Sequence, residues 1–275
     1  MADDPEGVKI LVVREIVSRC SFAHVVQHKG VQDNGYAVAC LVKDVEWLGV
    51  TKLMLRSDNE PAITKLLTET LKTLRVEVPD IDQVAEEHPP ERDPQANGAI
   101  ESTVGGFKGL LRTYILALET RLGHRVPPEH PVVSWLVQHT AHLMTIRIKG
   151  EDGKTAYERV RMRPFSTRMM EFAELCRYRL DPKDMMSNGT LASRWGTGIF
   201  LGMCRTTGRY QLWTNDGVIA SRSVLRMPEI QKWDQERVAT VAIRPFQLHT
   251  PADELRVASR LYIKRSEIDA FGYCE

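Results

Sequence analysis

Apolar positions in the first third of the chain alternate between the spacing of strands and the spacing of helices. Two β-branched runs separated by a short polar break predict adjacent strands in a hairpin. Beyond them a helical pattern, a further strand and a second helical pattern follow. Strands that alternate with helices predict an α/β domain with at least part of its sheet parallel. The predicted elements are strands at 10–13 and 22–26, a helix at 36–48 ended by Gly49, a strand at 51–55 and a helix at 60–74.

The middle of the chain predicts one loop and two helices. The stretch 79–98 is rich in proline and charge, so we expect a loop there. Asp93 is a credible N-cap and Pro94 suits the first helical position, and the long helix that they begin runs to about Leu122. Another helix is expected over roughly 130–146.

The pattern changes after about residue 190. Short apolar runs are separated there by Gly208 and by an Asn-Asp-Gly turn at 215–217, which predicts a small antiparallel sheet or an SH3-like barrel. The expected organisation is a disordered start at 1–8, an α/β domain with C-terminal helices at 9–180, a small β-barrel domain at 190–230 and a C-terminal extension at 231–275.

Composition narrows the class of protein only slightly. The chain is 43% hydrophobic, enough for a sizeable core, and its 37 Lys and Arg nearly balance 36 Asp and Glu for a net charge of +1. Nucleic-acid-binding domains usually carry a clear basic excess, so DNA is disfavoured as a partner unless the cations gather on one surface. The five cysteines lack CxxC spacing, which argues against zinc and fits an intracellular compartment. The apolar run near the start is too short to span a membrane, and no secretory leader precedes it.

Two carboxylates stand out by position. Asp58 lies just past the predicted strand at 51–55, and active-site residues of open α/β sheets often lie at the carboxyl ends of strands. Glu101 lies in the first turns of the long helix, where the helix dipole favours a carboxylate. Each also has an ordinary structural interpretation, Asp58 as a turn residue and Glu101 as a solvated cap.

The helix that carries Glu101 is predicted to have two distinct faces. An apolar stripe is expected to pack on the sheet, and roughly 90° away Glu101 and Gly105 line up with Lys108 and Arg112. A metal-bound carboxylate beside a phosphate-binding track would need this arrangement, although a solvated face would have the same pattern. The apolar stripe consists of Val104, Phe107, Leu111, Leu118 and Leu122.

Two segments around these carboxylates resemble the second and third acidic motifs of retroelement integrases. They are Leu-Arg-Ser-Asp-Asn-Glu-Pro at 55–61 and Asp-Pro-Gln-Ala-Asn-Gly-Ala-Ile-Glu at 93–101. The copia type is the closest match, because the similarity continues downstream and covers roughly residues 9–235. The downstream segments are Lys-Thr-Ala-Tyr-Glu at 154–158, Phe-Leu-Gly at 200–202, Gly-Arg-Tyr at 208–210 and Ser-Arg-Ser-Val at 221–224.

The resemblance implies an RNase H-like mixed sheet flanked by helices, a DNA partner and metal-dependent DNA strand transfer. Asp58 matches the second residue of a catalytic Asp, Asp, Glu triad, and Glu101 matches the third, so both are implied catalytic residues and metal ligands. Mg²⁺ or Mn²⁺ suits such oxygen ligands. Asn97 begins the catalytic helix and, with Lys108 and Arg112, is expected to contact nucleic acid. The resemblance also implies nuclear localisation if functional and a homo-oligomer, with no membrane and no nucleotide cofactor.

The chain departs from the family at its start. The strand that should carry the first triad Asp has no counterpart before the strand at 10–13, and Asp3 and Asp4 fit a linker better than a strand. We therefore expect the first strand to be missing and strand transfer to be impaired. The alternative is a catalytically inactive nucleic-acid-binding remnant of a retroelement polyprotein. A nuclease of the RNase H type is a third possibility that the downstream similarity disfavours.

Two other features have both functional and structural interpretations. His139 and His142 lie three apart on a predicted helix and could bind a metal, but histidines on a helix surface are commoner. Interleaved tryptophans and arginines after residue 190 suit a nucleic-acid-binding barrel, and core tryptophans with solvated arginines suit the pattern equally well. These residues are Trp195, Trp213 and Trp233 with Arg194, Arg205, Arg209, Arg222 and Arg226.

Overall fold

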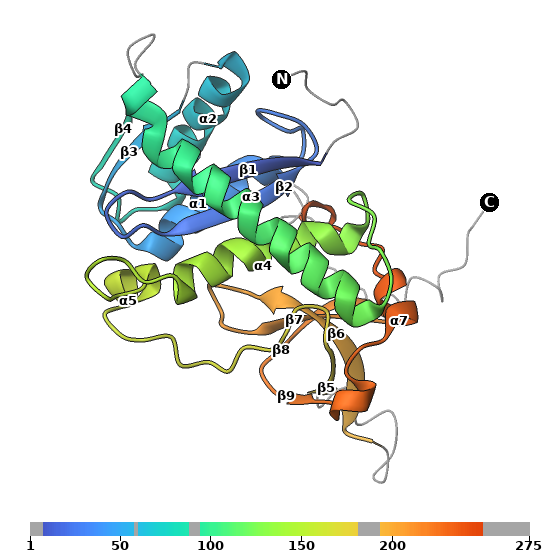
Figure 1. Ribbon diagram of the computed structural model, residues 1–275. Helices are drawn as coiled ribbons and strands as arrows, with labels where there is room; N and C mark the ends of the chain where they lie inside the picture. The colour runs from blue at the N-terminus through green and yellow to red at the C-terminus, as the bar shows by residue number, and fades with distance from the viewer. Residues whose placement is uncertain (1–7, 58–59, 88–93, 181–192, 250–275) are drawn as a thin grey trace, which may run out of the picture.

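A buried helix, α4 (Pro131–Arg147), lies between two groups of β-strands in the computed structural model (Figure 1). The structure describes residues 8–57, 60–87, 94–180 and 193–249, with the backbone alone at 94–97. Strand β2 and helix α3 pack on α4, and strand β6 packs on it as well. A helix that is apolar on every side must be covered on every side, and α4 is covered in this way. The result is a mixed α/β fold.

The first hairpin confirms the predicted pair of strands. β1 (Lys9–Arg14) and β2 (Ser21–Val26) pair antiparallel. Alternate residues of β2 face opposite layers, because successive side chains of a strand point to opposite sides. Phe22 meets Trp47 of α1 edge to face, whereas the backbone of Ser21 is hydrogen-bonded to the hydroxyl of Thr145 in α4. β2 is therefore buried on both faces.

Helix α1 (Tyr36–Leu48) confirms the helix predicted at 36–48. Gly49 ends it in the left-handed conformation, with φ 67°, where its N–H bonds the carbonyl of Val45. Glycine adopts this conformation without the steric cost of a Cβ atom, and it ends many helices for that reason.

Strand β3 (Lys52–Arg56) and helix α2 (Pro61–Glu77) lie where a strand and a helix were predicted. The loop expected at 79–98 is wrong in part, because β4 (Gln83–Glu87) pairs parallel with β3. Three of the five residues of β4 are exposed, so the strand lacks the apolar run that would reveal it in the sequence. Its identity comes from its pairing with β3.

Within the described residues, the strands of the first domain do not form the single mixed sheet that was expected. β1–β2 and β3–β4 form two separate two-stranded sheets. Helix α1 packs on β2 and α2, and α2 packs on β4, so the two sheets are linked through helices. No helix among the described residues is long and apolar enough to cross a membrane.

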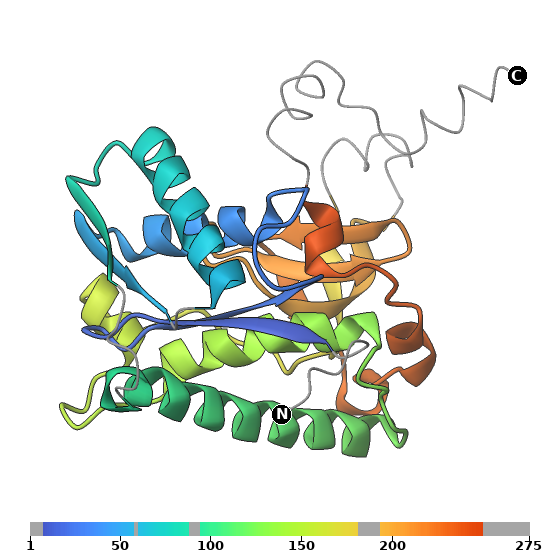
Figure 2. The same cartoon turned by 90° about the horizontal axis from the view of Figure 1, so that it is seen from above.

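Helix α3 (Pro94–Leu122) has the predicted bounds, and Gly123 follows it with φ 68°. The predicted N-cap Asp93 lies outside the described residues. α3 packs against α4 and β1, as Figure 2 shows from above. α4 confirms the helix predicted over 130–146, and 13 of its 17 residues are buried. The two helices cover one face of the hairpin, and α1 covers the other.

The predicted closed barrel after residue 190 is not found. The strands of this region form an open antiparallel sheet of five strands, in the order β8-β7-β6-β5-β9. The edge strands β8 and β9 do not pair with each other, so the sheet does not close. The short apolar runs do form strands, which confirms that part of the prediction. The strands are β5 (Leu175–Arg179), β6 (Trp195–Met203), β7 (Tyr210–Thr214), β8 (Gly217–Ser221) and β9 (Val224–Arg226).

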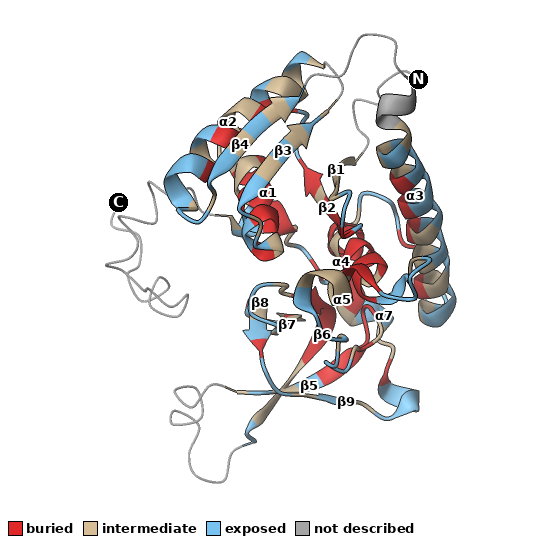
Figure 3. Cartoon of the chain, turned by 90° about the vertical axis from the view of Figure 1, so that its left-hand side faces the viewer, coloured by how far each residue is buried: buried red, intermediate tan, exposed pale blue. Residues whose placement is uncertain are grey.

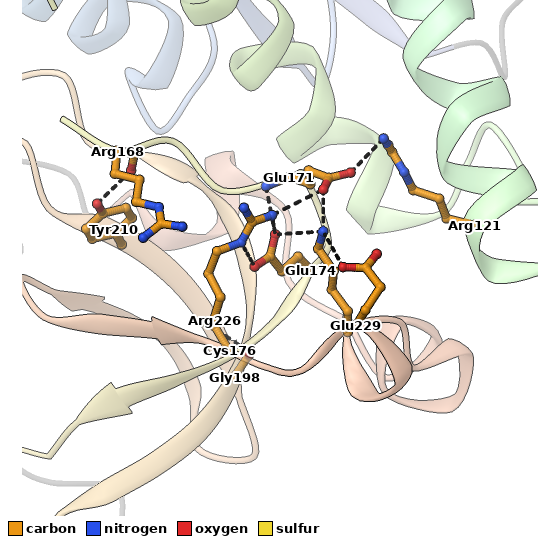
Figure 4. A network of polar contacts seen from close by, with 10 residues as sticks. Arg121, Arg168, Glu171, Glu174, Cys176, Gly198, Tyr210, Arg226 and Glu229 are labelled. Atoms are coloured by element: carbon orange, nitrogen blue, oxygen red, sulfur yellow. Dashed lines mark hydrogen bonds and ion pairs between the residues drawn. The ribbon is translucent and has the colours of Figure 1, made fainter. Parts of the chain in front are cut away.

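A network of charged residues fastens α3 to this second sheet (Figure 4). The carboxylate of Glu174 is fully buried and accepts two 2.6 Å hydrogen bonds from Arg226. Glu171 bonds Lys232, and Arg121 of α3 contacts Glu171 at 2.6 Å. Such a buried network holds its elements in one geometry, because each group needs its partner to offset the cost of leaving water.

Short helices complete the described chain. α5 (Ala156–Arg161) begins with a capping box in which Thr155 and Glu158 bond each other's backbone N–H groups. Three further helices follow the second sheet, η1 (Glu229–Gln231), α7 (Gln235–Ala239) and η2 (Pro245–Leu248). The predicted extension at 231–275 is described as far as residue 249.

Candidate functional site

The two faces predicted for α3 are present. Phe107, Leu111 and Leu118 are buried, while Val104 is half-buried and Leu122 packs against the core. Figure 3 shows the exposed side of α3 turned away from α4. The exposed side carries Glu101, Lys108 and Arg112.

This exposed face can interact with an anion through its cations. Neither Lys108 nor Arg112 makes an ion pair with any residue that the structure describes. Their charges are available to an external partner, and a surface cation of this kind contacts phosphate groups well. Glu101 lies about two turns before Lys108 and about three turns before Arg112 along the helix, so a carboxylate and two cations share one exposed surface.

Four glycines on α3 are not required by packing. A Cβ atom added at Gly98, Gly105, Gly106 or Gly109 would meet nothing within 4 Å. Glycine inside a helix costs about 1 kcal/mol relative to alanine. The exposed face therefore includes small residues that leave the helix backbone accessible.

The other predicted site residues cannot be placed against Glu101. Asp58 lies outside the described residues, as do Asp3 and Asp4, and the side chain of Asn97 is not described either. The proximity of Asp58 to Glu101, which the predicted metal site needs, stays a prediction.

A metal ion would need more ligands than the described residues bring together. No group of three or more His, Cys, Asp or Glu side chains that could hold a metal is present among them. Glu101 is exposed and is a single carboxylate, whereas divalent ions such as Mg²⁺ are held in proteins by several oxygen ligands. The described residues therefore do not fit a metal by themselves, and no catalytic step through a metal follows from them.

The two histidines of α4 are buried, which the sequence did not indicate. His139 is 4% exposed and His142 is 5% exposed, so their interpretation as surface residues was wrong. His139 packs on Phe172 and Phe200, and burial lowers its pKa to about 4. Burial also lowers the pKa of His142, helped by the charge of Arg205. Both are neutral core residues at neutral pH.

Two arginines, one in the turn after β6 and one in β9, contact other parts of the protein. Arg205 stacks on Phe22, with its guanidinium carbon 4.4 Å from the ring centroid, and donates to the carbonyl of Ser21 at 3.0 Å. Arg226 belongs to the Glu174 network described above. These two cations of the predicted nucleic-acid surface therefore have structural roles.

A second buried polar pair was missed by the sequence interpretation. His24 Nε2 of β2 lies 2.7 Å from Asp44 Oδ2 of α1. Burial alone would lower the pKa of His24, but the charge of Asp44, followed by Cys40, raises it to about 10. His24 is positively charged at neutral pH, and the pair fastens α1 to β2. Its residues lie 20 positions apart, and nothing in their spacing reveals the contact.

Comparison with known proteins gives a weak structural likeness. No protein-family model matches the chain, and no curated protein matches it. Among solved structures the chain is similar to the catalytic core domain of BIV integrase, with 20% sequence identity and a TM-score of 0.38. That match covers 56% of this chain and 85% of the other. A likeness at this level decides neither the activity nor the ligands of this chain.

Proposed function

We propose that this chain is a DNA-binding protein of the integrase type, with the exposed face of α3 in contact with DNA. One observation carries the proposal. The segment with the Asn-Gly-x-x-Glu signature lies in the first turns of a 29-residue helix. The exposed face of this helix carries Glu101 together with Lys108 and Arg112, which make no ion pair within the described residues. DNA binding relies on Lys and Arg that neutralise phosphates, and an exposed helix face can follow a duplex.

The finer part of the proposal concerns chemistry. We propose that the chain derives from a copia-type integrase in which Asp58 and Glu101 share Mg²⁺ or Mn²⁺, and that strand transfer by this chain is weak. When bound, such ions activate the attacking oxygen and stabilise the leaving oxygen of a phosphodiester. Asn97 would support the start of the helix. The sequence motifs at 55–61 and 93–101 support this assignment.

Removing the two cations of α3 tests the proposed DNA contact. In Lys108→Gln/Arg112→Gln, we expect the affinity for a short DNA duplex to fall about tenfold at moderate salt. We also expect the slope of log affinity against log salt to decrease by about 2, because each lost phosphate contact removes about one unit. Fluorescence anisotropy over a range of KCl concentrations measures both quantities.

A matched control removes the same charge elsewhere. Lys65 and Arg75 are exposed on α2, so Lys65→Gln/Arg75→Gln should leave the salt slope unchanged. If the α3 variant and this control bind DNA equally, α3 is not the contact surface. If the unmodified protein does not bind DNA, the proposed function itself is wrong.

The same protein preparation tests the proposed chemistry. With Mg²⁺ and labelled DNA ends, we expect little or no end joining, and no difference between the unmodified chain and Glu101→Gln. Robust joining that Glu101→Gln abolishes would contradict weak catalysis and would show that the carboxylate takes part in it.

A further inference from the structure

Positive charge also gathers around the turn between β1 and β2 and around α5. Residues 14–19 and 147–163 contain eight Lys and Arg against four Asp and Glu, a local net charge of +4. The whole chain has a net charge of +1, so the remainder is negative by three. The nearly balanced composition therefore conceals an asymmetric distribution of charge. In such a protein the net charge says little about what the surface binds.

The fold brings these two segments together. The turn between β1 and β2 lies beside α5, on the left of Figure 1. Arg159 of α5 donates to the carbonyl of Ser18 at 2.9 Å, and the thiol of Cys20 lies 3.7 Å from the carbonyl of Ala156. The segments are more than a hundred residues apart in sequence, so the charge cluster exists only in the folded protein.

The carboxylates in this region are engaged in local structure. Glu15 accepts hydrogen bonds from the backbone of Val17 at 2.8 Å and of Ser18 at 2.5 Å. Glu158 completes the capping box of α5, and Asp152 bonds Arg159 at 2.9 Å. Three of the four acids thus stabilise the turn and the helix. In the described part of the chain, the only ion pair that they make with a cation of this region joins Asp152 to Arg159.

Three cations in this region are free to contact a ligand. Arg19, Lys149 and Lys154 are exposed, and none makes an ion pair within the part of the chain that the structure describes. Burial, then the charge of Arg19 and less strongly that of Arg159, lowers the pKa of Arg14. Arg14 is therefore repelled by these two neighbouring cations, and an anionic partner would relieve that repulsion.

The turn holds Arg19 in a fixed position. Its φ is +63°, a left-handed conformation that is uncommon for residues other than glycine. The backbone N–H of Glu15 bonds the carbonyl of Cys20 at 2.9 Å and closes the turn around it. The turn therefore presents its cation in a defined geometry.

We propose that this surface, the α5 patch of Arg14, Arg19, Lys149, Lys154 and Arg159, binds the phosphate backbone of nucleic acid as a second contact beside the exposed face of α3. The identification of the polyanion as nucleic acid rests on the proposed function. The alternative polyanion, an anionic lipid surface, is less suited to the patch. An amphipathic helix on a membrane surface buries an apolar face among the lipid headgroups, and α5, with six residues, offers little apolar area for this.

The test removes the three free cations together. In Arg19→Gln/Lys149→Gln/Lys154→Gln, we expect duplex affinity at moderate salt to fall tenfold or more and the salt slope to decrease by about 3. The control is Lys43→Gln/Lys65→Gln/Arg75→Gln, which removes three exposed cations from α1 and α2 and should leave the slope unchanged. All substituted side chains are exposed, and thermal unfolding of each variant shows that it is folded.

The outcomes separate this inference from the proposed function. If the patch variant has the salt slope of the unmodified protein while the α3 variant has a smaller slope, the α5 patch is overturned and the proposed function stands. If the patch variant has a smaller slope while the α3 variant does not, the patch is supported and the proposed DNA contact through α3 is wrong. The last measurement is the binding of the unmodified protein and the patch variant to vesicles that contain phosphatidylserine. Binding to them that depends on the patch, without any binding to the duplex, would overturn the assignment to nucleic acid.

Discussion

Trp135→Ala is expected to lower the free energy of unfolding by about 3–5 kcal/mol, the usual cost of removing a buried tryptophan. Trp135 is 1% exposed in the second turn of α4, the helix that the hairpin, α3 and the second sheet all contact. Its indole N–H donates to the carbonyl of Ile243 at 2.8 Å, so the substitution leaves both a cavity and an unsatisfied carbonyl. Urea denaturation followed by circular dichroism measures the change.

Leu116→Ala is the control for this substitution. Leu116 is 62% exposed on α3, and we expect its truncation to change stability by no more than about 0.5 kcal/mol. Equal effects of the two substitutions would show that α4 is not the centre of the core.

Glu174→Gln is expected to destabilise the fold by about 3 kcal/mol, because it deprives the buried Lys232 and the partly exposed Arg226 of a counter-charge. Glu174 is fully buried and accepts both hydrogen bonds from Arg226, and Lys232 is itself 5% exposed. The neighbouring Glu171 retains part of the compensation, which keeps the expected loss at the lower end of the range for broken buried pairs. Chemical denaturation at neutral pH measures it.

The same network provides a control. Glu229 contacts Lys232 at 3.5 Å with a side chain that is 83% exposed, so Glu229→Gln should cost less than about 1 kcal/mol. Glu174→Gln/Arg226→Met should recover part of the loss, since it removes one of the uncompensated charges. A double variant that is less stable than Glu174→Gln would contradict a role based on charge.

The helices could be predicted from the sequence because local residues decide where they begin and end. Gly49 ends α1 through its own backbone conformation, and Pro94 begins α3 at the position where its missing N–H costs nothing. Strand β4 could not be predicted, because its partner β3 lies across a helix and its own residues are mostly exposed. The open form of the second sheet depends likewise on which strands pair.

In the candidate site, too, the features set by local sequence could be predicted and those set by distant contacts could not. The helical repeat of α3 predicted that Glu101, Lys108 and Arg112 share an exposed face, and the structure confirms it. The α5 patch could not be predicted, since Arg159 and Ser18 meet across 141 residues. The burial of His139 could not be predicted either, because it depends on the layers that cover α4.

The position of α4 between two layers has a consequence for how the chain folds. The bonds that enclose this region join residues distant in sequence, such as Thr145 to Ser21, 124 positions apart, and Arg205 to Ser21, 184 positions apart. Closing such large loops costs entropy before any contact rewards it, and chains dominated by distant contacts fold slowly. In a nascent chain, α4 therefore stays uncovered on one side until β6 has been synthesised, and during that interval its apolar surface is prone to aggregation.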